Sequence, residues 1–369
     1  MKKLLISYSY PPQIGGLENY YLELCRSLDP KEICVLTQFH PNDRQFDLTQ
    51  LYPIYRTEFF AGAVSPKWRP LKHNIRDIIS SEKIDKLVFG HFHPFNLLGR
   101  SFRLPYVIFG HGTDIRRIKD SYYQKWIFKR AFGGCEKIIL NSNYLAGEVK
   151  RLVGESEKIQ VIYPGVDIAR LNQPAPDLAE KKKLLGIEDK DLVMLSLGRL
   201  IAEKNFEAII KIMPALLNIL PNLMYLIVGD GPERERLETL VRQSALEYKV
   251  KFIGQIENSA EQKALYYQMA HLYVGVPADS NDFEISYLEA QATKTPVVAS
   301  KAGGNGEAVA DGQAGILVDP KNQREIMEAI YKILGDRQLW QMMAAAGKER
   351  MEKEFNREVQ LKKIKEAIG

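Results

Sequence analysis

The chain has 369 residues, of which 45% are hydrophobic and 26% charged, and it carries a net charge of +5 and three cysteines. These values predict a globular protein of two or three domains and exclude a disordered chain, a fibrous repeat and a disulfide-stapled miniprotein. No apolar run approaches the roughly 18 residues of a membrane-spanning helix. Residues 1–6 have the pattern of a strand rather than that of a signal peptide. The small number of cysteines indicates a reducing compartment.

Short apolar runs alternate with longer amphipathic segments along the chain. The apolar runs are typical of parallel strands buried on both faces, and in the first half they lie at 4–7, 33–37, 87–90, 106–110, 137–141 and 160–163. In the second half they lie at 193–197, 223–228, 250–253, 272–276 and 296–299. Helical patterns separate them, for example at 17–28, 205–220 and 233–244. This alternation predicts an α/β fold.

The alternation occurs twice and is interrupted at residues 167–183, where two prolines and a charged run have the character of a linker. We therefore expect two doubly wound domains, residues 1–170 and 171–345. Residues 323–368 carry apolar residues at helical spacing. Because ligands of such sheets bind beyond the carboxyl ends of the strands, the loops there hold the candidate functional residues.

Two loops of the first half contain glycines at such positions. Gly15 and Gly16 follow the first strand and open a helix, where a ligand can approach the backbone and an anion is favoured; a plain turn is the alternative. A dinucleotide-binding fold would need G-x-G-x-x-G here, which counts against a dehydrogenase. Gly110-His111-Gly112-Thr113-Asp114 follows a buried strand, and His111 suits a turn residue or a catalytic residue equally well.

The second half places cations and a glutamate at equivalent positions. Arg199 and Lys204 follow its first strand and could grip a pyrophosphate, with two solvated surface cations as the alternative. The turn Gly229-Asp230-Gly231-Pro232 is interpreted as structural. At residues 280–290 a polar loop runs into a helix whose first amides could face a phosphate. Glu289, further along, could accept hydrogen bonds from vicinal ribose hydroxyls.

In this order and spacing, the motifs resemble those of glycosyltransferase family 4, the retaining enzymes of the GT-B fold, and the resemblance covers nearly the whole chain. Besides the loops above, it is carried by Pro164-Gly165-Val166-Asp167, Phe252-Ile253-Gly254, Leu288-Glu289-Ala290, Pro296-Val297-Val298-Ala299, Gly303-Gly304 and Gly315-Ile316-Leu317-Val318. The resemblance implies two Rossmann-like domains facing across a cleft. The first binds the acceptor and the second the donor, and a last helix, residues 346–369, crosses back to the first domain.

The resemblance also implies roles for single residues. The donor is a UDP- or GDP-sugar, with no further cofactor and no metal. Arg199 and Lys204 bind its diphosphate, and His111 stabilises charge at the anomeric centre, which makes these three the catalytic set. The remaining donor contacts are Gly15 and Gly16 above the diphosphate, Gly254 beside the base, the Ile285 and Ser286 amides on the phosphate, and Glu289 on the ribose.

The chain departs from the family pattern at one place. The family usually has two glutamates separated by seven residues, and because the second matches Glu289, the first falls on Asn281. An amide can still hydrogen-bond a sugar hydroxyl, but it carries no charge. Glu284, or Asp282 with a one-residue shift, is a candidate to replace the missing carboxylate.

Basic charge is concentrated in the first half. Residues 1–170 hold 25 basic and 17 acidic residues, a net charge of +8, whereas residues 171–369 hold 26 and 29, a net charge of −3. The segment from Arg116 to Arg130 combines six cations and one acid with aromatic residues. Such a helix is typical of an element that binds an anionic membrane surface, and an ordinary packed helix is the alternative. No nucleic-acid-binding motif is present, so nucleic acid is not an expected partner.

The sequence therefore predicts a retaining, metal-independent hexosyltransferase. It would move a hexose from a UDP- or GDP-sugar to a glycolipid, a lipid-linked saccharide or a polysaccharide, in the cytoplasm and peripherally at the inner membrane face. Two alternatives stay open: a nucleotide-sugar epimerase of the same architecture, and a catalytically weak saccharide-binding homologue, which Asn281 suggests.

Overall fold

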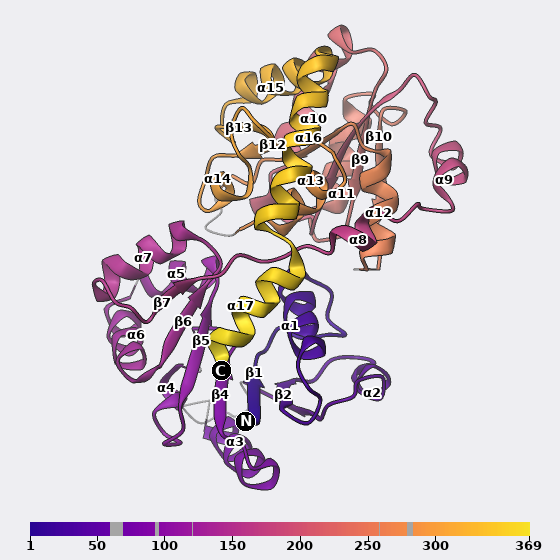
Figure 1. The fold of residues 1–369 in the computed structure, drawn as a ribbon. Coiled ribbons are helices and arrows are strands. Elements are labelled where there is room, and N and C mark those ends of the chain that lie inside the picture. Colours follow the sequence, from indigo (N-terminus) through magenta and orange to yellow (C-terminus); the bar gives the residue numbers. More distant parts are fainter. Residues whose placement is uncertain (60–68, 93–95, 120, 258, 279–282) are drawn as a thin grey trace. The chain divides into compact units, whose positions relative to one another are not determined.

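The computed structural model describes residues 1–59, 69–92, 96–119, 121–257, 259–278 and 283–369 (Figure 1). The chain divides into two compact units: Met1–Pro164 together with Glu358–Gly369, and Gly165–Arg357. Each unit contains one parallel β-sheet, which confirms the predicted α/β class.

The first unit contains a seven-stranded sheet in the order β3-β2-β1-β4-β5-β6-β7, in which all neighbours are parallel. The strand order changes direction between β1 and β4, so the carboxyl ends of these two strands form a topological switch point. The strands are β1 (Lys3–Ile6), β2 (Ile33–Gln38), β3 (Ile54–Thr57), β4 (Lys86–Phe89), β5 (Tyr106–Gly110), β6 (Lys137–Leu140) and β7 (Ile159–Val161).

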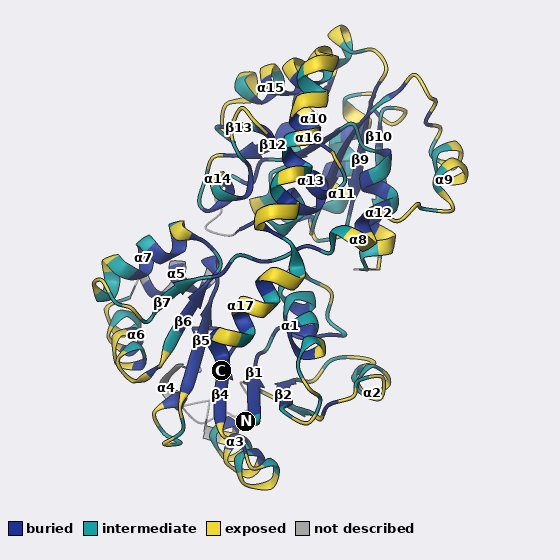
Figure 2. Cartoon of the chain, in the orientation of Figure 1, coloured by how far each residue is buried: buried dark blue, intermediate teal, exposed yellow. Residues whose placement is uncertain are grey.

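Alternate residues of these strands pack into two layers on opposite faces of the sheet, as the two-residue period of a strand requires. Leu4 and Ile6 belong to the layer with α3, α5, α6 and α7, whereas Leu5 belongs to the layer with α1 and α17. In Figure 2 the central strands β1, β4 and β5 appear dark blue because they are buried. The helices are α1 (Gly16–Ser27), α2 (Asp43–Asp47), α3 (Arg69–Glu82), α4 (Asn96–Gly99), α5 (Gly112–Lys119), α6 (Tyr122–Gly134), α7 (Asn143–Val153) and α17 (Arg357–Ile368).

The second unit contains a six-stranded parallel sheet in the order β10-β9-β8-β11-β12-β13. Its switch point lies between β8 and β11. Met194 of β8 and Val274 of β11 belong to a core layer that also includes side chains of α10, α11 and α15. The strands are β8 (Leu192–Leu197), β9 (Leu223–Val228), β10 (Val250–Gly254), β11 (Leu272–Gly275), β12 (Val297–Ser300) and β13 (Gly315–Val318).

Some helices of the second unit begin at a residue whose side chain caps the first turn. Ser259 accepts a hydrogen bond from the Gln262 amide at 3.2 Å, and Asp336 accepts two from the first turn of α16, which satisfies amides that a helix start leaves unpaired. The helical elements are α8 (Ile168–Leu171), α9 (Leu178–Leu184), η1 (Ala202–Lys204), α10 (Phe206–Ile219), α11 (Arg234–Gln243), α12 (Ala260–Met269), α13 (Ile285–Ala292), α14 (Asn305–Ala308), α15 (Gln323–Gly335) and α16 (Arg337–Glu354).

The segment expected to be a linker contains two short helices, α8 and α9, with both prolines between them. The two units meet along the chain at Gly165 and Arg357 instead, and there the backbone of Val166 exchanges hydrogen bonds with Phe355 and Arg357 at 2.9 and 3.1 Å. A Cβ at Gly165 would lie 2.5 Å from the Arg357 Cα. Glycine is therefore required at this position by the close approach of two backbone segments.

Candidate functional site

The loop after β8 carries Arg199 and is held by the turn after β9. The amide of Gly198 donates to the Val228 carbonyl, and the amide of Leu200 donates to the Asp230 carbonyl, each at 2.9 Å. Gly229 has a φ of 138°, and a Cβ there would lie 1.9 Å from the Gly198 oxygen. Among the described residues, the exposed Arg199 side chain has no ion-pair or hydrogen-bond partner. The turn after β9 therefore holds the backbone of Gly198 and Leu200 in place, and the loop between them presents the side chain of Arg199.

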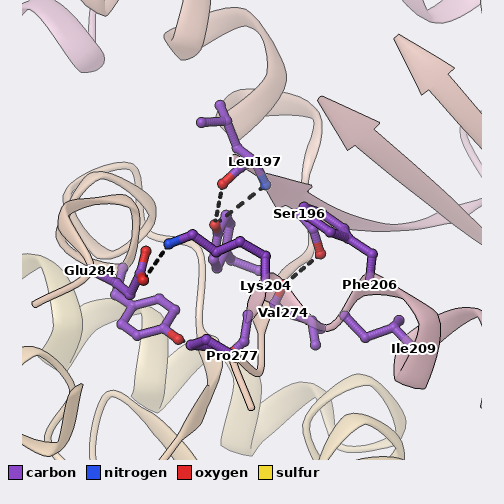
Figure 3. Close-up of a pocket in the computed structure, with 11 residues that line it drawn as sticks. Ser196, Leu197, Lys204, Phe206, Ile209, Val274, Pro277 and Glu284 are labelled. Carbon is purple, nitrogen blue, oxygen red and sulfur yellow. Dashed lines mark hydrogen bonds and ion pairs between the residues drawn. The ribbon is translucent and has the colours of Figure 1, made fainter. Parts of the chain in front are cut away.

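Lys204 lies in the short helix η1 of the same loop. Asn205 ends this helix with a φ of 58°, and its side-chain amide donates to the carbonyls of Val276 and Pro320 at 3.1 Å each. The ammonium of Lys204 forms an ion pair with the carboxylate of Glu284, and the two side chains are only 29% and 14% exposed (Figure 3). The structure therefore brings these two predicted site residues into contact.

A pocket surrounds this ion pair at the switch point of the second sheet (Figure 3). It combines apolar walls with the two charged groups, which is the usual character of a ligand site in an α/β fold. Its lining residues come from the ends of β8 and β11, from η1 and the start of α10, from the loop after β11, and from the start of α13 with its N-cap: Ser196, Leu197, Lys204, Phe206, Ile209, Tyr273, Val274, Gly275, Pro277, Glu284 and Tyr287.

Helix α13 begins at Ile285, directly after Glu284, and carries Ser286 and Glu289. The carboxylate of Glu289 is buried and is held by Lys263 at 2.7 Å and by the Tyr267 hydroxyl at 2.9 Å. Each oxygen uses one lone pair for these contacts and retains a second. Glu289 is thus fixed in position by two α12 side chains that the sequence analysis did not include.

Three further residues named from the sequence belong to this unit. Gly254, the last residue of β10, has a φ of 87°, and its carbonyl accepts the Gly229 amide at 2.9 Å. It lies at the same sheet edge as Arg199, because parallel strands end there together. Asn281 and Asp282 lie outside the described residues.

In the first unit, α1 begins at Gly16, with Gly15 as its N-cap. The buried Glu18 in the first turn folds over Gly15, because its Oε2 would lie only 2.0 Å from a Cβ at that position. A side chain at residue 15 would therefore displace this carboxylate. The structure places an acidic group beside the loop that the sequence analysis expected to cap a diphosphate.

His111 follows β5 and is buried, with 5% of its surface exposed. Its Nε2 lies 2.7 Å from the hydroxyl of Tyr21 on α1, while its Nδ1 has no partner among the described residues. Burial lowers the pKa of His111 to about 4, so its imidazole is neutral at physiological pH. A neutral imidazole can lie beside the positive charge that develops at an anomeric centre, whereas an imidazolium would oppose that charge.

A second buried histidine, His91, lies beside His111 at the end of β4, and the sequence analysis missed it. Its Nε2 contacts the Ser7 hydroxyl at 3.0 Å, and its Nδ1 lies 4.0 Å from the Asp114 carboxylate. The residue types are those of a nucleophilic triad, but the Ser7 proton is donated to the Ser9 carbonyl at 2.9 Å. His91 must then donate to Ser7, so it cannot serve as a base for this hydroxyl.

The part of the chain that the structure describes also bears on metal binding, thiol chemistry and membrane insertion. No three His, Cys, Asp or Glu side chains gather there in an arrangement that could hold a metal ion. The three cysteines are buried free thiols. Within the same residues, no helix combines the length and the apolar character needed to cross a bilayer.

Comparisons with known proteins agree with this geometry. Residues 14–170 match the sequence model of Glycosyltransferase Family 4, and residues 177–350 match that of Glycosyl transferases group 1. A curated relative from Corynebacterium glutamicum, a GDP-mannose-dependent monoacylated alpha-(1-6)-phosphatidylinositol monomannoside mannosyltransferase, is 27% identical over 97% of this chain and 95% of its own. N-acetyl-alpha-D-glucosaminyl L-malate synthase from Bacillus anthracis is 24% identical over 96% and 94%.

Solved structures give the fold. The crystal structure of Anabaena HepE in complex with UDP superposes with a TM-score of 0.86 at 21% identity, covering 100% of this chain and 99% of that one. Sucrose-phosphate synthase from Thermosynechococcus elongatus superposes with a TM-score of 0.82 at 22% identity, covering 99% and 98%. With its two parallel α/β units and both sequence matches, the chain has the GT-B fold and belongs to the family 4, group 1 glycosyltransferases.

Proposed function

We propose that the protein transfers a hexose from a UDP- or GDP-sugar to a saccharide or glycolipid acceptor. The observation that carries the proposal is the pair of cations at the switch point of the second sheet: Arg199, which has no partner among the described residues, and the pocket residue Lys204. Glycosyl transfer leaves a nucleoside diphosphate, and preorganised cations stabilise its growing charge. Similar proteins support this donor class, since one relative is a GDP-mannose-dependent mannosyltransferase and one structural neighbour was solved in complex with UDP.

The proposed transfer retains the configuration of the sugar and needs no metal. The acceptor attacks on the face from which the diphosphate leaves, and a leaving phosphate oxygen takes the proton of the acceptor hydroxyl. No side-chain nucleophile is then required. Arg199 and Lys204 carry the charge on the diphosphate, with the bidentate guanidinium and the point-like ammonium in complementary roles.

Glu284 and Glu289 are proposed to hold the sugar and the ribose. Glu284 replaces the glutamate that the family usually has at the position of Asn281, and its carboxylate accepts hydrogen bonds from hydroxyls of the donor hexose. The ion pair with Lys204 supports this role because it holds the carboxylate in the pocket. Glu289, fixed by Lys263, offers its remaining lone pairs to the ribose hydroxyls.

A donor panel tests the proposal. Purified protein is heated with each UDP- and GDP-sugar in turn, and a ligand at 100 times its dissociation constant should add about 2.7 kcal/mol of stability. Transfer is then measured with the stabilising donor. Arg199→Ala and Lys204→Ala should each lower turnover at least about 100-fold, whereas Arg324→Ala, a change at an exposed cation on α15, should not. Full turnover by both site variants would refute the phosphate assignment.

A membrane surface is proposed as the place where the acceptor is met. On α6, Tyr122, Tyr123 and Trp126 are 91%, 66% and 56% exposed. Lys125 lies 5.4 Å from the centre of the Tyr122 ring, and Arg130 lies 5.7 Å from that of Trp126. Aromatic rings beside cations suit the boundary between headgroups and acyl chains of an anionic bilayer. The side chains of Arg116, Arg117 and Lys119, and residue Asp120, lie outside the described part of the chain.

Co-sedimentation with vesicles tests this surface. The protein should sediment with phosphatidylglycerol vesicles and remain in solution with phosphatidylcholine vesicles. Changing Trp126 to Ala together with Lys125 to Ala should reduce the bound fraction, while Arg324→Ala should leave it unchanged. Equal binding to both lipids, or full binding by the double variant, would show that α6 is an ordinary surface helix.

A further inference from the structure

The carboxylate of Glu284 pairs with one of the two cations assigned to the diphosphate. It forms an ion pair with the ammonium of Lys204, whereas the exposed Arg199 side chain has no partner among the described residues. Among the described side chains that line the pocket, those of Lys204 and Glu284 are charged and the others are neutral (Figure 3). All of these groups belong to the second unit. In the free protein a carboxylate therefore lies where the proposed function places a phosphate.

This carboxylate is not used to cap helix α13. Glu284 is the N-cap residue of that helix, but its side chain accepts no hydrogen bond from the first turn. The N-cap residues of α15 and α16, Asn322 and Asp336, do accept such bonds. The Glu284 side chain is directed to Lys204 instead. A change that removes its charge therefore takes no side-chain cap away from α13.

The backbone that carries Lys204 is held by the loop after β11. On one side of Lys204, the carbonyl of Glu203 accepts the Ala278 amide at 3.0 Å. On the other side, the Asn205 side chain donates to the Val276 carbonyl at 3.1 Å. Lys204 lies between these two anchors, so its ammonium stays within reach of the pocket. A phosphate that contacts this ammonium then brings its negative oxygens to the place that the carboxylate holds.

The two anions interfere with each other at Lys204. An ammonium has three hydrogens to donate, but a carboxylate and a phosphate in contact with the same ammonium repel each other. When a nucleoside diphosphate binds, the Glu284 carboxylate loses its contact and receives no new donor. When a nucleotide sugar binds, hydroxyls of the hexose can donate to the carboxylate, and such charge-assisted hydrogen bonds offset the lost ion pair. The same displacement therefore costs more for the product than for the donor.

We propose that Glu284 is a specificity residue, which competes with the diphosphate for Lys204 and thereby makes the protein bind a nucleotide sugar in preference to the nucleoside diphosphate that remains after transfer. The inference rests on the proposed function and adds to it a reason why the product leaves. Specificity is a difference between two affinities, and an unpaired charge in the unwanted complex is one way to create it.

Isothermal titration calorimetry of the full chain tests the proposal. Wild-type protein and Glu284→Gln are titrated with UDP, GDP and the UDP- and GDP-sugars of the donor panel. The comparison is made between the sugar that stabilises the protein most and its own nucleoside diphosphate. Glu284→Gln should bind the nucleoside diphosphate about 10-fold more tightly, since Lys204 is then free, and its affinity for the nucleotide sugar should change less than about threefold.

Glu328→Gln is the matched control, because it removes the same charge from an exposed ion pair with Arg324 on α15 of the same unit. It should change both affinities less than about twofold. Unchanged or weaker binding of the nucleoside diphosphate by Glu284→Gln would refute the competition. An equal change in both affinities would also overturn the proposal, because the hexose would then offset nothing.

Failure of the proposed function has a different signature. If the wild-type protein binds neither nucleoside diphosphates nor nucleotide sugars, or if Arg199→Ala and Lys204→Ala bind the nucleoside diphosphate as tightly as the wild-type protein, the phosphate assignment is wrong and this inference fails with it. If both cation variants bind the nucleoside diphosphate more weakly and Glu284→Gln does not bind it more tightly, the proposed function stands and the role of Glu284 as a competitor is refuted.

Discussion

Acidification should destabilise the first unit because it holds two buried neutral histidines. In the folded protein, burial lowers the pKa of His111 to about 4, from an ordinary value of 6.5. Burial and the neighbouring His111 also lower the pKa of His91. Each imidazole therefore binds its proton more weakly in the folded than in the unfolded chain. The unfolded state takes up more protons as the pH falls below 6.5, so the free energy of unfolding decreases.

The size of the effect follows from the His111 pKa. At pH 5 its ring is almost fully protonated in the unfolded chain and almost fully neutral in the folded one. Integrating the proton difference from pH 7 to pH 5 gives a loss of about 2 kcal/mol from this residue. His91 acts in the same direction, so the loss for the wild-type protein should exceed that for His111 alone.

The assay is urea unfolding at pH 7, 6 and 5, followed by fluorescence and circular dichroism. At pH 7, His111→Gln should have a lower free energy of unfolding than the wild-type protein, since it disturbs a buried site. Between pH 7 and pH 5, however, the free energy of unfolding of His111→Gln should fall by about 2 kcal/mol less than that of the wild-type protein. His73→Gln, which removes an exposed histidine on α3, should keep the wild-type dependence. Parallel curves for His111→Gln and the wild-type protein would refute the neutral buried imidazole.

Two further predictions concern the second unit and its border. Gly165→Ala should lower the free energy of unfolding by about 1–3 kcal/mol, because the new Cβ would lie 2.5 Å from the Arg357 backbone. The control is Gly147→Ala on α7, where a Cβ meets no atom within 4 Å, and it should raise the free energy of unfolding by up to about 1 kcal/mol. Lys263→Met should cost about 3–5 kcal/mol in urea unfolding by leaving the Glu289 carboxylate buried without its cation, and Lys263→Arg should restore most of it.

The sequence predicted the strands that are buried on both faces and missed two at the edges of the sheets, β3 and β13. Central strands are continuous apolar runs and were recognised as such. Strand β3 has the sequence Ile-Tyr-Arg-Thr, with its first three residues half-buried, and its Arg56 pairs with Asp47 and with the Pro11 carbonyl, each at 2.7 Å. A buried arginine whose partners lie elsewhere in the chain has no local apolar signature, so pattern analysis cannot find such a strand.

For the same reason, some features of the candidate site can be predicted from the sequence and others cannot. Cations directly after a strand, such as Arg199 and Lys204, can be read from the sequence because parallel strands end at one edge. The ion pair of Lys204 with Glu284 and the role of Lys263 could not, since each contact joins residues that only the strand order brings together. One local signal was available but unused: His91 follows a glycine at the end of β4 as His111 follows a glycine at the end of β5.

The half of the chain that has the positive net charge is not the half that contains the proposed diphosphate-binding cations. Residues 1–170 carry +8, but their buried histidines are neutral, and the cations described on α6 are at the surface. The proposed diphosphate cations belong to the half with a net charge of −3. A long-range excess of charge affects encounters with large anionic surfaces, whereas an anionic ligand is bound by the few groups that touch it. The basic first half is therefore an argument for an anionic acceptor or membrane, and the location of the donor phosphates has to be argued from Arg199 and Lys204 alone.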